Sequence, residues 1–101
     1  MKVVENNSLK YLKNVSDGVA TFNLHGQIGD TINKDGELIR GISGADFINS
    51  FQYISEQPEI NAINISINST GGSVLDGYSI FSAIHNCLKP TATIIDGLAA
   101  S

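Results

Sequence analysis

Cysteine is almost missing from this 101-residue sequence, and its scarcity limits the chemistry that we expect. The single cysteine, Cys87, cannot form a disulfide within the chain, and no metal-ligand spacing surrounds it. We therefore expect no metal centre, and a protein of a reducing compartment, the cytoplasm. Cys87 itself is interpreted as a small buried hydrophobe on a helix rather than as a reactive thiol.

Positive charge and long apolar runs are scarce as well. Six lysines and arginines stand against ten aspartates and glutamates, which gives a net charge of −4, and no basic cluster could neutralise a row of phosphates. No stretch has the length of a signal-peptide core or a membrane span, and no phosphate-binding loop pattern is present. We therefore expect no nucleic acid partner, no membrane contact and no cofactor.

The composition nevertheless predicts a folded chain, because 42% of the residues are hydrophobic and only 16% are charged. The first eighteen residues are polar and mixed, and the turn signal Asp17-Gly18 predicts that a loose N-terminal segment, 1–18, ends there. The rest, 19–101, is interpreted as the N-terminal portion of one domain. Within it, the hydrophilic residues 30–42 are expected to form an excursion or a small hairpin.

Strands and helices alternate along this portion. Apolar and polar residues alternate over 19–25 and 63–67, which predicts two half-buried strands, and 91–96 is interpreted as a third. Ser43 and Ser73 stand at the N-cap positions of two helices, each with an aspartate three residues later. The expected apolar stripes of these helices are Phe47, Ile48, Phe51 and Ile54, and then Leu75, Tyr78, Phe81, Ile84 and Leu88. This order predicts an α/β fold with a largely parallel sheet covered by helices.

Two segments of small residues follow predicted strands: 68–74 after the second and 97–101 after the third. In α/β sheets, ligands usually bind at the carboxyl ends of the strands. A turn such as Gly71-Gly72 before a helix leaves backbone N–H groups that can converge on an anion, and glycine lets a substrate approach closely. Such a turn can form an oxyanion hole, although neither segment identifies an enzyme by itself.

Taken together, the two segments resemble one protein family. Residues 67–101 closely resemble the Clp protease proteolytic subunit, whose pattern is an Asn-Ser-Pro-Gly-Gly turn, a helix ending in Lys-Pro, a strand and Gly-x-Ala-Ala-Ser. The resemblance implies that Ser101 is the nucleophile and that the Gly72 N–H helps to bind the oxyanion. The substrate-binding residues that it implies are Gly71, Gly72, Ser73 and Val74. The chain departs from the pattern at Thr70, where the family's proline would make the turn more rigid.

The resemblance also implies a fold and a reaction. The fold would be the spiral of strand-strand-helix units shared by Clp proteases and crotonases, and the reaction would be peptide-bond hydrolysis by a serine endopeptidase. A serine nucleophile needs a base and an orienting acid, which in this family follow it in sequence, so the 101-residue chain alone is expected to be inactive. His25 and His85 do not match the family's catalytic histidine and are interpreted as packed or solvated, and Asp96 does not match its acid.

Partners are implied by the resemblance alone. They are a polypeptide substrate, further copies of the chain in a heptameric ring, and either an ATP-dependent unfoldase or phage capsid and scaffold proteins. The phrase from His25 to Gly29, together with the polar excursion after it, looks more like the phage head-maturation type than the housekeeping type.

Three alternatives stay open. A protease of the signal peptide peptidase type shares the glycine turn and the serine, but uses a lysine as its base. A crotonase-like acyl-CoA enzyme shares the spiral fold and needs no serine at position 101. An inactive assembly subunit needs no chemistry at all. The sequence after Ser101 separates the two proteases, because one needs a histidine there and the other a lysine.

Overall fold

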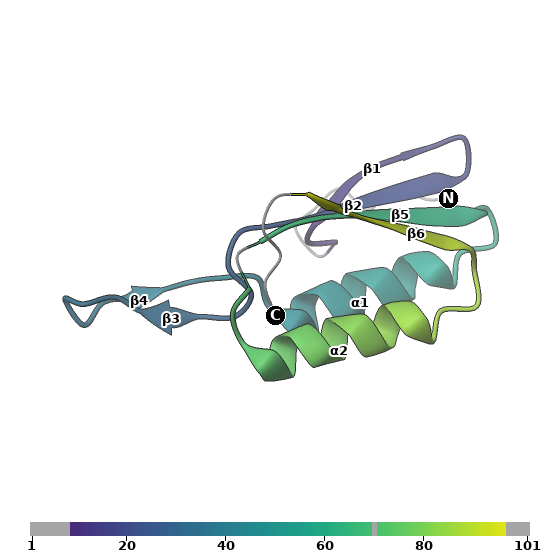
Figure 1. Ribbon diagram of the computed structural model, residues 1–101. Helices are drawn as coiled ribbons and strands as arrows, with labels where there is room; N and C mark the ends of the chain where they lie inside the picture. The colour runs from purple at the N-terminus through teal and green to yellow at the C-terminus, as the bar shows by residue number, and fades with distance from the viewer. Residues whose placement is uncertain (1–8, 70, 97–101) are drawn as a thin grey trace.

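The computed structural model describes residues 9–69 and 71–96. Its elements are β1 Leu12–Ser16, β2 Val19–His25, β3 Thr31–Ile32, β4 Leu38–Ile39, α1 Gly44–Ser55, β5 Ala62–Asn68, α2 Val74–His85 and β6 Thr91–Asp96. Strands β1-β2-β5-β6 form one sheet in that order, and β3 pairs with β4 in a separate hairpin. Both helices lie against the same face of the larger sheet, and the β3–β4 hairpin extends away from it (Figure 1).

The pairing within the large sheet is mostly parallel, as expected. Phe22 of β2 lies opposite Ile65 of β5, and Ile65 lies opposite Thr93 of β6, both in parallel pairs. The predicted strands 19–25 and 91–96 are confirmed, and the strand predicted at 63–67 is one residue longer at each end. The mixed α/β class with its largely parallel sheet is therefore confirmed.

Strand β1 was not predicted, because its stretch reads as polar and mixed. It pairs antiparallel with β2. Asp17 and Gly18 have φ angles of 51° and 78°, the left-handed values that a two-residue hairpin turn requires. The expected turn is present, but it joins two paired strands instead of ending a loose segment, so the expectation for 12–16 was wrong. The division of the chain at residue 18 stays a prediction.

The core lies between the sheet and the helices. Alternate residues of β2 and β5 are fully buried: Ala20, Phe22, Leu24, Ile63 and Ile65. They meet the predicted stripe of α1, where the ring centroid of Phe22 lies 5.4 Å from that of Phe47 and 5.9 Å from that of Phe51. The period-2 and helical patterns thus predicted correctly which faces of β2, β5 and α1 are buried.

The stripe predicted for α2 is mostly wrong. Leu75, Tyr78 and Phe81 are 80%, 69% and 64% exposed, whereas Ile80 is buried and Ile84 packs against the core. Apolar residues occupy several faces of this helix, so their spacing fits more than one stripe. Packing of α2 beside α1 then decides which stripe is covered. Cys87 is half-buried, but it lies just beyond the helix, after the C-cap residue Asn86.

The excursion predicted at 30–42 is a hairpin, with Ile32 opposite Leu38. Arg40 pairs with Asp30 at 3.1 Å, and the other carboxylate oxygen of Asp30 accepts the Gly41 N–H at 2.9 Å. These contacts close the base of the hairpin, where it leaves the carboxyl end of β2. Within the two described ranges, no helix is long and apolar enough to cross a membrane.

Candidate active site

Three backbone segments meet beyond the carboxyl ends of β2 and β5. The segment that contains Ile28 lies between the glycine turn on one side and the segment that contains Ile42 on the other. The Ile28 N–H donates to the Gly71 carbonyl at 2.9 Å, and the Ser73 N–H donates to the Ile28 carbonyl at 2.7 Å. On its other side, Ile28 forms a parallel bridge with Ile42. The Gly-Gly turn is therefore held along one edge, in the manner of a short parallel strand.

Gly72 lies between the two residues of the turn that bond to Ile28. In a parallel ladder the residues on either side of it, Gly71 and Ser73, use their groups toward Ile28, so the N–H and carbonyl of Gly72 point to the opposite edge. Gly72 is exposed, and within the described parts of the chain its N–H has no hydrogen-bond acceptor. An exposed, unpaired N–H in a fixed orientation is what an oxyanion hole requires.

The turn itself is stabilised by Ser69, whose role the sequence analysis did not identify. Ser69 is 4% exposed, and its hydroxyl accepts the Gly71 N–H at 3.0 Å. The hydroxyl also lies 3.2 Å from the Gly71 carbonyl oxygen, to which it donates. A serine two residues before a glycine is a signal for such a local turn, which sequence reasoning could have used.

Helix α2 begins directly after the turn. Ser73 is its N-cap, and the Ser73 hydroxyl accepts the Asp76 N–H at 3.2 Å, as the capping spacing predicted. Ser43 caps α1 in the same way, accepting the Asp46 N–H at 3.1 Å. Val74, another predicted site residue, is 78% exposed at the first position of α2.

A pocket of about 310 Å³ opens at this turn. Its lining consists of Ile28, Gly71, Gly72, Ser73, Val74, Gly77 and Tyr78. The structure thus brings together Gly71, Gly72, Ser73 and Val74, the four residues predicted to bind substrate. Ser101, the predicted nucleophile, and Thr70 lie outside the described residues. A larger groove of about 600 Å³ runs between α1 and α2, and none of the predicted site residues lines it.

Neither histidine lines the pocket at this turn. His25 ends β2, and its Nε2 lies 3.4 Å from the Ser66 hydroxyl on the neighbouring strand. His85 stacks on Phe81, with ring centroids 5.8 Å apart, at the far end of α2. Roughly 17 Å of helix separates His85 from the turn, since each helical residue adds about 1.5 Å. Among the described residues, neither histidine is paired with a carboxylate of the kind that orients a catalytic base.

Comparison with known proteins points to one family. The family model described as Clp protease matches residues 36–101, so the match begins within the β3–β4 hairpin and includes the glycine turn. The ATP-dependent Clp protease proteolytic subunit 1 of Chlamydia caviae is 35% identical over 65 residues, which are 64% of this chain and 34% of that protein. The ATP-dependent Clp protease proteolytic subunit of Cyanophora paradoxa is 36% identical over 67 residues, 66% of this chain and 32% of that protein.

The chain spans about a third of the length of the curated relatives that it matches. No solved structure matches it. The resemblance seen in the sequence over 67–101 is confirmed at the level of the family, and the match to the family model covers well over half of the chain. The chain belongs to the Clp protease family.

Proposed function

We propose that the polypeptide carrying this chain is a serine endopeptidase of the Clp proteolytic-subunit type. Ser101 would be its nucleophile, and the Gly72 N–H one donor of its oxyanion hole. The observation that carries the proposal is the state of Gly72: the residue is exposed and lines a pocket, and its N–H is unpaired within the described residues. Family membership supplies the reaction class, and Gly72 supplies the chemistry that this reaction needs.

The proposed reaction begins with attack of the Ser101 hydroxyl on the carbonyl carbon of a peptide bond. A base takes the hydroxyl proton, and the carbonyl oxygen becomes an oxyanion that accepts a hydrogen bond from the Gly72 N–H. The protonated base then gives its proton to the leaving amine, and water hydrolyses the acyl-enzyme. We assign the base and its orienting acid to a histidine and an aspartate that follow Ser101.

Substrate binding follows from the free edge of the turn. Ile28 occupies one edge of the segment from Gly71 to Val74, and no described residue bonds to the N–H or carbonyl of Gly72 on the other edge. An extended peptide can add to such an edge as a further strand, and its main chain then supplies the affinity. A polypeptide substrate fits this edge better than a compact small molecule does.

The spiral fold, a heptameric ring and a cytoplasmic location belong to the same proposal. An unfoldase or a capsid protein would be the further partner, depending on whether the protein is of the housekeeping or the phage type. Native mass spectrometry of the longest polypeptide that carries this sequence checks the ring, with seven copies as the expected result. A monomer or dimer at micromolar concentration would contradict it.

Labelling with a fluorophosphonate tests the catalytic claim, because only an activated serine reacts rapidly. We expect the longest polypeptide that carries this sequence to be labelled at Ser101 and to hydrolyse peptides. Ser101→Ala should abolish labelling and lower kcat by several orders of magnitude. Ser79→Ala, at an exposed position of α2, is the matched control and should leave both unchanged.

The labelling experiment, together with acyl-CoA assays and substitutions of downstream residues, separates the alternatives. Absence of labelling in folded, assembled material would indicate an assembly subunit. Acyl-CoA hydratase or thioesterase activity that survives Ser101→Ala would indicate a crotonase-like enzyme. Labelling that depends on a downstream lysine, and not on a histidine, would indicate the signal peptide peptidase type.

A further inference from the structure

Asp46 and Asp76 occupy equivalent positions in the two helices, yet their carboxylates differ. Each is the third residue after a serine N-cap, and each donates its N–H to that serine. The Asp46 carboxylate pairs with Lys10 at 3.2 Å, and both side chains are about half exposed. Such an exposed pair adds little stability. The Asp46 carboxylate therefore joins the start of α1 only to an exposed lysine before β1, and not to the other helix.

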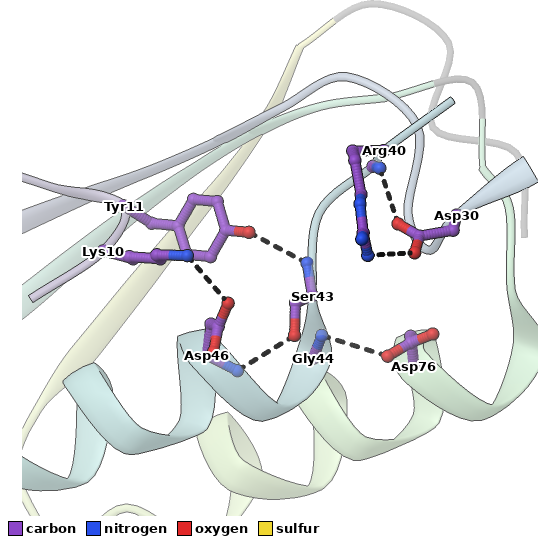
Figure 2. A network of polar contacts seen from close by, with 9 residues as sticks. Lys10, Tyr11, Asp30, Arg40, Ser43, Gly44, Asp46 and Asp76 are labelled. Carbon is purple, nitrogen blue, oxygen red and sulfur yellow. Dashed lines mark hydrogen bonds and ion pairs between the residues drawn. The ribbon is translucent and has the colours of Figure 1, made fainter. Parts of the chain in front are cut away.

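Asp76 instead connects the two helices. Its Oδ1 accepts the N–H of Gly44 at 3.0 Å in a part-buried position (Figure 2). Gly44 is the first residue of α1, and the first N–H groups of a helix have no acceptor within the helix itself. The Asp76 carboxylate thus satisfies a buried donor at the positive end of α1, where a negative charge is favoured.

The contact is close enough to restrict the residues around it. A Cβ at Gly44 would lie 2.8 Å from Asp76 Oδ1, and a Cβ at Gly29 would lie 2.6 Å from the Ser73 Cβ and 3.0 Å from Asp76 Oδ2. Glycine at both positions lets the ends of three segments touch. Asp76 therefore lies where the base of the β3–β4 hairpin, the start of α1 and the start of α2 meet.

This position links Asp76 to the proposed oxyanion hole. Gly72 is held by the bonds of its neighbours to Ile28, and α2 begins two residues after it, at Val74. We propose that Asp76 is a positioning residue: by tying the start of α2 to Gly44, it fixes the direction of the Gly72 N–H. This inference rests on the proposed protease function, and Asp76 itself touches no substrate.

Kinetics of Asp76→Ala, in the longest polypeptide that carries this sequence, test the inference. Removing an oxyanion donor outright lowers kcat about 10²–10³-fold, so a misdirected donor should lower kcat per fluorophosphonate-titrated site by roughly 10-fold. KM should stay within about twofold, because the donor acts mainly in the transition state. Asp76→Asn keeps an oxygen that can accept the Gly44 N–H, and should restore most of the rate.

Two measurements distinguish positioning from a general loss of stability. Destabilisation alone would lower the melting temperature and the number of titrated sites, but not kcat per site. Amide hydrogen exchange at Gly44 should become faster in Asp76→Ala than in Asp76→Asn, whether or not the protein is a protease. Asp46→Ala removes the equivalent carboxylate of α1, and is expected to leave kcat per site and exchange at Gly44 unchanged.

The outcomes separate this inference from the function on which it rests. Unmodified protein that does not label overturns both. Unmodified protein that labels, with an Asp76→Ala variant whose kcat per site is unchanged, overturns the positioning role alone. Should Asp76→Ala fail to fold, Asp76→Ser replaces it, since its hydroxyl is one bond too short to reach Gly44. An Asp76→Ser variant as fast per site as Asp76→Asn then overturns the inference.

Discussion

At Gly72, two separate physical constraints exclude a side chain. Its φ angle is 146°, a value that residues with a Cβ rarely adopt, and an added Cβ would lie 2.0 Å from the Ile28 carbonyl oxygen. The second constraint comes from backbone, which cannot rotate away as the end of a flexible side chain can. The glycine is therefore needed for the close pairing with Ile28 as well as for the proposed approach of substrate.

Gly72→Ala should accordingly reduce both stability and activity. We expect the free energy of unfolding to fall by about 1–3 kcal/mol, because a strained backbone position costs that much. Serine labelling should fall with it, as the turn shifts away from Ile28. Denaturant unfolding and the labelling rate measure the two effects.

Gly77→Ala is the control, since Gly77 lies in α2 and a Cβ there meets no atom within 4 Å. This variant should be more stable by roughly 0.5–1 kcal/mol, the usual preference for alanine over glycine in a helix. Equal effects of the two substitutions would contradict the role of the Ile28 contact.

The sequence predicted much of the site at this scale, because its signals are local. The glycine pair, the two serine N-caps and the aspartates three residues after them are all visible in short windows. The bond from Gly44 to Asp76 joins residues 32 positions apart, and no local pattern reveals it. This hydrogen bond depends on the packing of α1 beside α2.

At the scale of elements, the two helices show when apolar spacing identifies a buried face. In α1, polar residues flank a single apolar stripe, and the stripe with Phe47 and Phe51 is buried as predicted. In α2, apolar residues surround much of the helix, and the covered face carries Ile80 rather than Phe81. Strand β1 was missed because an edge strand of mixed polarity lacks the period-2 signal.

A matched pair of phenylalanine substitutions tests this difference between the helices. Phe47→Ala should lower the free energy of unfolding by about 3–5 kcal/mol, because it leaves a cavity among three packed rings. Phe81→Ala, at an exposed position, should change it by less than about 0.5 kcal/mol. Thermal or denaturant unfolding of both variants gives the comparison, and a large loss for Phe81→Ala would show that its face of α2 is covered in the whole protein.

At the scale of the whole molecule, the β3–β4 hairpin is a separate structural unit. Among the described strands, β3 and β4 pair only with each other, and the hairpin extends away from the sheet (Figure 1). Asp30 closes its base through Arg40 and Gly41. The sequence predicted its existence from polarity and glycine, but could not show that its base lies against the proposed oxyanion turn.

Replacing residues 31–39 by two glycines should therefore leave the fold intact. We expect the free energy of unfolding to change by less than about 1 kcal/mol, because shortening a closed loop changes its closure entropy only slightly. Circular dichroism and denaturant unfolding are the measurements. Loss of a cooperative transition would mean that the hairpin supports the sheet, and a change in peptide selectivity without unfolding would place it beside bound substrate.

The tight turn between β1 and β2 also has a consequence for the order in which the sheet forms. Ser16 pairs with Val19 across this turn, so the two residues are close in the sequence. The parallel pairs instead join residues far apart in the sequence, Val19 with Ala62 and Ile63 with Thr91. Pairing of distant residues is slow, because the entropy of closing the chain is lost before any contact forms. During synthesis, the β1–β2 pair can therefore form while β5 is still within the ribosome. The free edge of β2 is then available for pairing with β5, and β6 adds to β5 afterwards.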